Sequence, residues 1–196
     1  MVETELPDRR KTIIEAALKT FVAYGFKRTT MADIADAAGI SRPALYLLFK
    51  NKNDIFRAGF IDLVEDILGR MKTILDGDGF LPDRVADAVV AGLVTPFREI
   101  HDTPHGAELF DAKQELAEDL GDQWFEEMER LIAEALERAR LGGELTLPPG
   151  ATSSEIARVL VFSLEGIKHR THIGSETEAP IRLLIGTVIG PMMTAR

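Results

Sequence analysis

Cysteine is absent from the 196 residues of the chain, which excludes thiol catalysis, disulfide bonds and cysteine-ligated zinc. Long hydrophobic runs are absent as well: no stretch reaches about 18 apolar residues, so we expect no membrane span. The acidic start, Met-Val-Glu-Thr-Glu, lacks the apolar run of a secretory signal. What is present, 45% hydrophobic and 28% charged residues, is typical of a globular protein. We therefore expect a soluble, cytoplasmic protein of one large or two small domains.

The usual catalytic motifs are missing too. The chain has no Gly-x-Ser-x-Gly, no phosphate-binding glycine loop and no His-Glu-x-x-His. Two histidine pairs, His101 with His105 and His169 with His172, have spacings that can hold a metal on a helix. However, Pro104 interrupts the first pair and the second lacks an evident acidic third ligand. We expect neither an enzyme nor a cofactor or metal site, although an enzymatic or scaffold role for the later part of the chain stays open.

The net charge of -9 is unevenly distributed along the chain. Residues 1–52 contain nine Lys and Arg and six Asp and Glu, a net charge of +3, so the remainder carries -12. A small basic segment on an acidic protein is suited to binding a polyanion at one end only.

Helical periodicity dominates the sequence and no strand is expected, so the predicted fold class is all-α. Gly25 is expected to end the first helix. Pro96 should kink or break a fifth helix, and Gly121 should bend a long later one. The remaining expected helices begin at about residues 30, 41, 51, 153 and 178, and residues 141–150 form a loop. Asn51, with Asp54 three residues on, can cap the helix that begins near residue 51, and Ser153 or Ser154 can cap the one that begins near residue 153.

The most informative pattern follows the first helix. Thr30 and Asp33 have the spacing of a capping box at the start of the second helix. Ser41 is a good N-cap for the third helix, with Pro43 in its first turn. Between the two helices, Ala38-Gly39-Ile40-Ser41 provides the short glycine-containing turn of a helix-turn-helix. In that motif the second helix of the pair enters the major groove of DNA.

Three stretches between Arg10 and Phe56 carry a specific resemblance: Thr29-Thr30-Met31-Ala32-Asp33-Ile34-Ala35, Ala38-Gly39-Ile40-Ser41 and Leu45-Tyr46-Leu47-Leu48-Phe49-Lys50-Asn51-Lys52. This segment resembles the DNA-binding domain of the tetracycline-repressor (TetR) family. The resemblance implies a helix-turn-helix domain over residues 1–52 and a helical ligand-binding and dimerisation domain over residues 53–196. It also implies a homodimeric transcriptional repressor that binds a palindromic DNA operator and is released by a small inducer.

The resemblance also implies which residues contact DNA. The residues expected to contact phosphates are Thr30, Tyr46 and Lys52. Those expected to face base edges are Arg42, Pro43, Ala44 and Leu47. Ser41 and Lys50 are also expected in the DNA-binding set. The family often has an aromatic residue or histidine where Leu47 and Leu48 stand, so here Leu47 can touch only an apolar edge such as a thymine methyl. Base recognition would then depend on Arg42, through guanine. For Tyr46 the alternative is a core aromatic.

Two further sets of residues are expected in the second domain. Bulky side chains in the helices that line inducer pockets of this family are Phe60, Val64, Phe97, Phe110, Trp124, Met128, Phe162 and His169; the alternative for each is ordinary core. An apolar or aromatic inducer is expected. The last two helices are apolar on more than one face, which predicts a dimer interface with Leu160, Leu164, Ile167, Leu184, Ile185, Val188 and Ile189, or alternatively a purely internal core.

The fourth helix, from about Asn51 to Leu75, is shared by the two expected domains. Any tilt of this helix would change the spacing of the two DNA-binding domains in a dimer. A ligand that prefers the wrong spacing would shift the population away from DNA.

Overall fold

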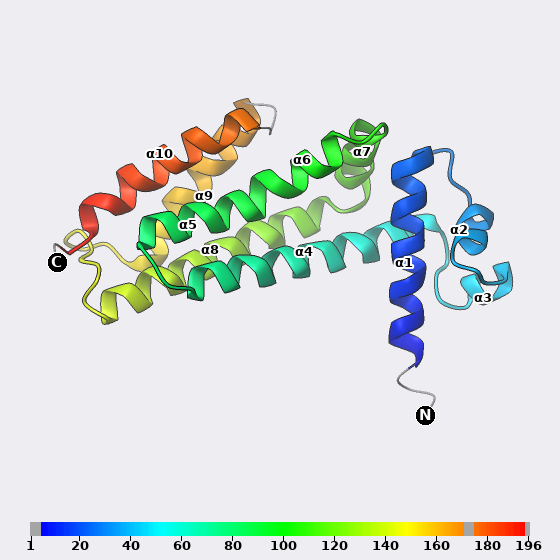
Figure 1. Cartoon of the computed structure of the whole chain (residues 1–196), viewed down its shortest axis with the longest axis horizontal. Helices are drawn as coiled ribbons and strands as arrows, with labels where there is room; N and C mark the ends of the chain where they lie inside the picture. Colours follow the sequence, from blue (N-terminus) through cyan, green and yellow to red (C-terminus); the bar gives the residue numbers. More distant parts are fainter. Residues whose placement is uncertain (1–4, 171–174, 195–196) are drawn as a thin grey trace. The chain divides into compact units, whose positions relative to one another are not determined.

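The structure, a computed structural model, describes residues 5–170 and 175–194, without the side chains of residues 5–7, 97, 168–170 and 175. Every regular element in these residues is helical, and the only extended pairing among them is an isolated bridge between Leu145 and Met193. Figure 1 shows the succession of helices along the chain. The predicted all-α fold class is confirmed.

The helices pack as two compact units. Unit 1 contains the described residues of 1–64 and 99–121, and unit 2 contains those of 65–98 and 122–196. Packing therefore groups a later segment, residues 99–121, with the N-terminal helices. The functional division at residue 52 stays a prediction.

The three N-terminal helices of unit 1 are α1 (Glu5–Tyr24), α2 (Met31–Ala37) and α3 (Arg42–Tyr46). Gly25, with φ +86°, ends α1 as predicted, because this left-handed conformation is costly for a residue with a Cβ. Gly39, with φ +66°, provides the bend between α2 and α3. The helix-turn-helix inferred from the sequence is thus present.

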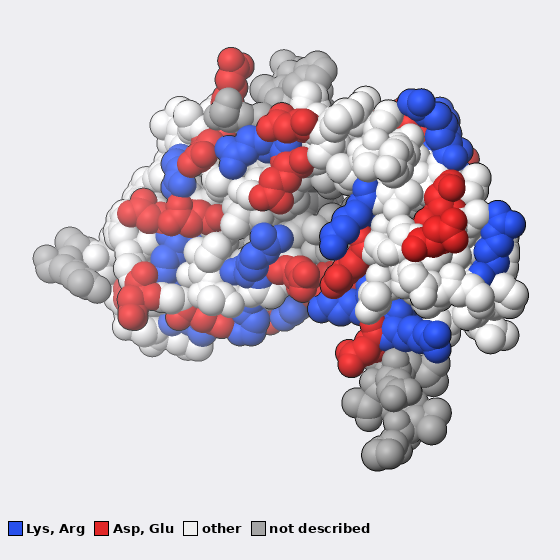
Figure 2. All heavy atoms as spheres, turned by 45° about the vertical axis from the view of Figure 1, so that its right-hand side comes forward, with Lys and Arg blue, Asp and Glu red and all other residues white. Residues whose placement is uncertain are grey.

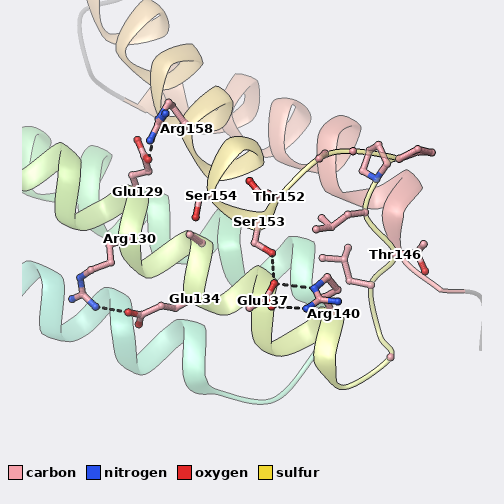
Figure 3. Close-up of a pocket in the computed structure, with 18 of the residues that line it drawn as sticks. Glu129, Arg130, Glu134, Glu137, Arg140, Thr146, Thr152, Ser153, Ser154 and Arg158 are labelled. Atoms are coloured by element: carbon pink, nitrogen blue, oxygen red, sulfur yellow. Dashed lines mark hydrogen bonds and ion pairs between the residues drawn. The ribbon is translucent and has the colours of Figure 1, made fainter.

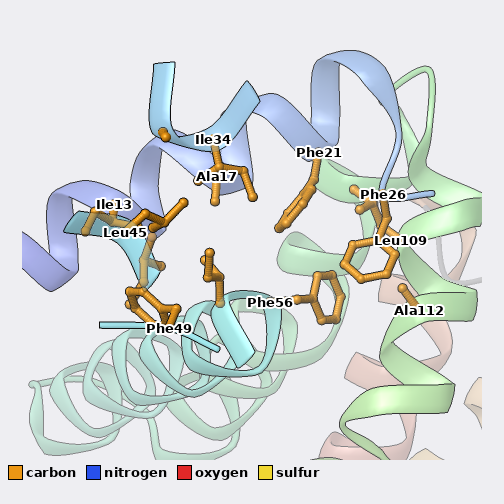
Figure 4. Close-up of a cluster of buried hydrophobic side chains, with 13 residues drawn as sticks. Ile13, Ala17, Phe21, Phe26, Ile34, Leu45, Phe49, Phe56, Leu109 and Ala112 are labelled. Carbon is orange, nitrogen blue, oxygen red and sulfur yellow. The ribbon is translucent and has the colours of Figure 1, made fainter. Parts of the chain in front are cut away.

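A single hydrophobic cluster holds these helices together (Figure 4). Phe21, Phe26 and Phe56 form an aromatic group with ring centroids 5.1–6.0 Å apart. Helix α7 (Gly106–Leu116) adds Leu109 and Ala112 to the same cluster. The three N-terminal helices therefore share their core with a helix from much later in the chain, which the sequence pattern did not reveal.

Helix α4 (Lys52–Asp76) is capped by Asn51, whose side-chain oxygen accepts a hydrogen bond from Asp54 N at 2.9 Å. The cap was predicted from the Asn51 and Asp54 spacing and is confirmed. The division between the two units falls within α4, after Val64.

The expected disturbance at Pro96 lies just before the proline. Helix α5 (Leu81–Val89) passes into a π-helical stretch, η1 (Val90–Val94), and then into α6 (Thr95–His101). Proline donates no N–H and its ring crowds the carbonyl four residues earlier, so the preceding turns widen. Gly92 in this stretch also approaches Met71 closely, because a Cβ there would lie 2.3 Å from the Met71 sulfur.

The prediction that Gly121 bends a long helix was wrong. The chain breaks at Ala117, between α7 and α8 (Glu118–Leu141), and α8 continues through Gly121. Arg57 on α4 explains the position of the break: it donates to the Leu116 carbonyl at 3.0 Å and pairs with the Asp119 carboxylate in the first turn of α8. A tertiary interaction thus decides where one helix ends and the next begins.

Unit 2 is completed by α9 (Ser153–Arg170), η2 (Ser175–Thr177), α10 (Glu178–Ile189) and η3 (Gly190–Met192). The predicted N-cap serine of α9 is corrected, since Thr152 caps this helix by accepting from Glu155 N at 3.2 Å. Helix α10 packs against α5 and α9. The interior of unit 2 is apolar, with Met71, Leu93, Met128, Ile132 and Leu136 all fully buried.

Candidate nucleic-acid interface

The ends of α2 and α3 are closed by side-chain caps. Asp33 N donates to Thr30 Oγ1 at 3.3 Å, and the Asp33 carboxylate accepts from Thr30 N at 2.8 Å and from its hydroxyl at 2.7 Å. These hydrogen bonds lower the pKa of Asp33, and the charge of Arg42 adds to the effect. At α3, Ala44 N donates to Ser41 Oγ at 3.3 Å. Both helices are therefore fixed at the ends that would face DNA.

Helix α3 presents one buried and one exposed side. Leu45 and Phe49 are buried beneath it. The exposed residues of the predicted DNA-binding set are Thr30, Ser41, Arg42, Pro43, Tyr46, Leu47 and Lys50, and Ala44 is half-buried. Leu47 is 86% exposed and Tyr46 53% exposed, so the alternative of a core aromatic does not apply to Tyr46. Among the four residues expected at base edges, Arg42, at the start of the helix, is thus the one with a charged side chain.

Lys52 lies differently from the phosphate ligand expected from the sequence. Its ammonium donates to the carbonyls of Phe26 at 2.6 Å, Lys27 at 3.0 Å and Thr29 at 2.9 Å, and lies 4.7 Å from the centre of the Phe26 ring. An ammonium has three N–H groups, so all of its donors are used inside the protein. Burial lowers the pKa of Lys52, while the carboxylate of Glu108 acts in the opposite direction. In this geometry Lys52 holds the loop before α2 and is not free to bind a phosphate.

The same loop is held from the other side by α7. Glu108 on α7 accepts a hydrogen bond from the backbone N–H of Lys27. Gly25 lies directly against this carboxylate, since a Cβ on Gly25 would be 2.6 Å from Glu108 Oε2. His105 Nδ1 lies 3.8 Å from the same carboxylate. Glu108 and Lys52 together fix the loop that positions Thr30, and sequence spacing gave no indication of Glu108.

The surface charge of the N-terminal helices differs from that of the remaining surface. In Figure 2, basic groups stand apart from one another around a mainly uncharged area on the part formed by α1–α3, with acidic groups among them. Residues 1–52 carry a net charge of +3, which favours the approach of a polyanion to this part of the chain.

The predicted inducer-binding residues are divided between the two units. Phe60, Val64 and Phe110 are partly buried in unit 1, and Lys113 Nζ lies 5.9 Å from the centre of the Phe60 ring. Trp124 and Met128 are buried in unit 2, whereas Phe162 is 62% exposed. The side chains of residues 97 and 169, Phe97 and His169, lie outside the described part of the structure. The inducer site stays a prediction.

Unit 2 contains a groove between α8 and the loop before α9 (Figure 3), which includes none of the predicted inducer-binding residues. Six of its charged side chains form three ion pairs: Glu129 with Arg158, Glu134 with Arg130, and Glu137 with Arg140. Ser153 also donates to Glu137 at 2.8 Å. These charged pairs distinguish the groove from the mostly apolar pocket that we expect for an inducer.

The predicted dimer residues lie at different depths in α9 and α10. The side chains of four of them, Leu160, Leu164, Ile185 and Ile189, are at most 1% exposed. They pack inside the chain and could not themselves contact a partner. Ile167, Leu184 and Val188 are partly buried. The exposed apolar side chains of the same helices are Val159, Phe162 and Leu183. The dimer interface stays a prediction.

His101 and His105, the histidine pair that the structure describes, do not form a common site. His101 Nδ1 lies 3.7 Å from Asp102 and His105 Nδ1 lies 3.8 Å from Glu108, so each faces a different carboxylate. His172 lies outside the described residues. In residues 5–170 and 175–194, no group of three or more metal-ligating side chains is assembled, and none of the helices has the length and apolar character needed to cross a membrane.

Comparison with known proteins finds a family model that matches the N-terminal helices. Residues 13–58 match the family described as bacterial regulatory proteins, tetR family. An uncharacterized HTH-type transcriptional regulator of Bacillus subtilis strain 168, YhgD, is 29% identical over 125 residues, which are 64% of this chain. The alignment covers 63% of the length of YhgD, less than two thirds of that relative.

Solved structures match over nearly the whole chain. A TetR-family transcriptional regulator from Mesorhizobium loti MAFF303099 has a TM-score of 0.73 at 19% identity, covering 98% of this chain and 100% of that one. SmeT, the repressor of the Stenotrophomonas maltophilia multidrug efflux pump SmeDEF, has a TM-score of 0.64 at 22% identity, covering 94% of this chain and 90% of SmeT. A complex of SmeT with triclosan has a TM-score of 0.63 at 20% identity, with coverage of 95% and 92%. These likenesses establish the same overall fold.

Proposed function

We propose, from the match of residues 13–58 to the family described as bacterial regulatory proteins, tetR family, that this chain is a member of the family and represses transcription in the cytoplasm. It acts as a homodimer bound to a palindromic DNA operator and is released by a small apolar or aromatic inducer. It is a regulator and not an enzyme.

The observation that carries this proposal is the exposed surface of α3. Helix-turn-helix proteins place this helix in the major groove with its N-terminal residues at base edges. Arg42 and Pro43 occupy that end and are exposed, while Leu45 and Phe49 anchor the helix in the core of unit 1. Arg42 suits the two acceptors of guanine, and Leu47 suits a thymine methyl.

Binding to DNA is tested with the full chain and a pool of random duplexes. After repeated selection and sequencing, we expect a two-fold symmetric consensus whose half-sites are about one helical turn, or a multiple of it, apart. Binding of the selected duplex at physiological salt should exceed that of a scrambled duplex by at least about 10³-fold. Equal binding of both duplexes would contradict the proposal.

A homodimer is supported by the exposed apolar side chains of α9 and α10. Phe162 is 62% exposed and Leu183 is 72% exposed, and large exposed apolar groups are typical of interaction surfaces when they cluster. Two DNA-binding units related by a two-fold axis would fit a palindromic operator.

An apolar inducer is supported by the buried apolar side chains of unit 2 and by SmeT, whose complex with triclosan shares this fold. Triclosan, an apolar aromatic compound, is therefore the first probe. Trp124, the single tryptophan, is 3% exposed in unit 2 and reports on ligand binding through its fluorescence. We expect triclosan to change this fluorescence and to release the selected duplex over the same concentration range. A fluorescence change without release would contradict its role as an inducer.

A further inference from the structure

Arg10, near the start of α1, contacts the segment that follows α3. Its Nη1 donates to the carbonyl of Leu48 at 3.1 Å, and its guanidinium carbon lies 4.4 Å from the centre of the Phe49 ring. Phe49 is 3% exposed, whereas Arg10 itself is exposed. The guanidinium therefore lies over a buried ring at the protein surface, fixed by one hydrogen bond and one cation–π contact.

The contact leaves most of the guanidinium available. A guanidinium has five N–H donors in one plane, and among the described residues Arg10 uses one of them, to Leu48. Because Arg10 is exposed, the donors that it does not use on Leu48 are accessible to a ligand. A planar pair of N–H groups matches the oxygens of a phosphate better than the single ammonium of lysine does.

The place of Arg10 relates it to the DNA-binding surface. Leu48 directly follows Leu47, which is 86% exposed, and precedes Lys50 by two residues. Arg10 therefore holds the C-terminal end of the reading segment, opposite the end that Ser41 caps. A cation near the last carbonyls of a helix is also favoured by the helix dipole.

We propose that Arg10 binds a phosphate of the DNA backbone while it fixes the end of α3, so that positioning of the reading helix and phosphate binding are joined in one side chain. This rests on the proposed DNA-binding function. Lys52, the lysine expected to bind phosphate, has its donors occupied, and Arg10 supplies a fixed and exposed cation instead.

The test measures the salt dependence of binding to the selected duplex for the full chain, Arg10→Met, Arg10→Lys and, as a matched control, Lys11→Met. Lys11 is exposed, adjacent in sequence and of the same charge. We expect Arg10→Met to weaken binding about tenfold at physiological salt and to lower the slope of log affinity against log salt by about one. Arg10→Lys should keep the slope but recover only part of the affinity. Lys11→Met should change both quantities less than Arg10→Met does.

The outcomes distinguish failure of the proposed DNA-binding function from failure of the proposed phosphate contact of Arg10. If the unaltered chain shows no preference for any selected duplex, the proposed function fails. If the unaltered chain binds and Arg10→Met keeps the full slope, the phosphate contact is refuted, even if affinity falls through misplacement of α3. If Arg10→Met does not fold, as judged by its circular dichroism, Arg10→Gln, which removes the charge but keeps a hydrogen-bond donor for the Leu48 carbonyl, decides: a slope lowered by about one would support the proposal, and an unchanged slope would overturn it.

Discussion

Arg42 is the side chain on which base recognition by α3 should mainly depend. It is exposed at the first position of the helix, and its neighbours on the same surface, Pro43 and Leu47, offer no donors from their side chains. Arg42→Ala is expected to weaken binding of the selected duplex by about 1–3 kcal/mol and to relax the preference at one base position. Fluorescence anisotropy on a panel of singly substituted duplexes measures both effects. An equal loss on every duplex would mean that Arg42 contacts only a phosphate.

Lys52 is expected to act on stability instead of on salt-dependent DNA binding. Lys52→Met removes a cation that satisfies three backbone carbonyls, so we expect the free energy of unfolding to fall by about 2–4 kcal/mol. Chemical denaturation measures this change. The slope of log affinity against log salt should stay the same for the folded variant. If Lys52 did bind a phosphate, its removal would lower this slope by about one. Lys50→Met, which changes an exposed lysine close by, is the control for stability.

Lys52 was expected to bind a phosphate but binds backbone carbonyls, and this difference shows which features of a single residue its sequence position can predict. The position of Lys52 at the start of α4 was predicted correctly, but the direction of its side chain depends on Phe26, Lys27 and Thr29, which lie 23 to 26 residues away in the chain. Local caps such as Thr30 with Asp33 were predictable because both partners lie within one turn. Contacts between residues far apart in the sequence leave no such local pattern.

At the scale of the helices, the same distinction separates predicted from unpredicted features. Starts and ends with local chemistry, such as Gly25 after α1 and Asn51 before α4, agree with the structure. The break at Ala117 follows from Arg57, which belongs to a different helix. The membership of α7 in the core of unit 1 depends on the packing of Leu109 against the aromatic cluster. Neither feature is encoded within one helix.

The join between α8 and the start of α9 gives a prediction about pH. Glu137 on α8 binds Arg140 in its own helix and accepts from Ser153 at the N-terminus of α9. These partners lower the pKa of Glu137 from 4.5 to about 2, with the Arg140 hydrogen bond as the largest cause. Because the folded state binds this proton less readily than the unfolded state, the stabilisation is complete above about pH 4.5 and is lost as the pH falls towards 2.

Glu137→Gln is therefore expected to reduce the free energy of unfolding at neutral pH, and the difference from the unaltered chain should shrink between about pH 4.5 and 2. Urea denaturation at a series of pH values measures this dependence. Glu134→Gln is the matched control, because Glu134 pairs with Arg130 within the same helix and joins no second element. A pH-independent difference for Glu137→Gln would show that its charge is not the source of the stabilisation.

For the whole molecule, function depends on bringing two DNA-binding units to one operator. A single α3 with one charged base-reading residue offers few specific contacts, so a lone chain should bind a half-site weakly. Joining two such units makes the second contact effectively intramolecular and can raise the overall affinity by about 10²–10⁴. Specificity of the proposed repressor would thus be a property of the dimer and of the spacing that it imposes, together with phosphate positioning and DNA shape.

The double variant Phe162→Glu with Leu183→Glu tests this dependence on the dimer. Both side chains are exposed and apolar on α9 and α10, so the change should leave the fold intact while placing like charges at the proposed interface. Light scattering should then give the mass of one chain, 21.6 kDa, where the unaltered protein gives twice that value. Affinity for the full palindrome should fall at least about 10²-fold, towards that for a single half-site. Leu141→Glu is the matched control, since Leu141 on α8 is as exposed as Leu183, at 72%. A double variant that remains dimeric would place the interface elsewhere, whereas a monomer that keeps full affinity for the palindrome would remove the dimer from the explanation of specificity.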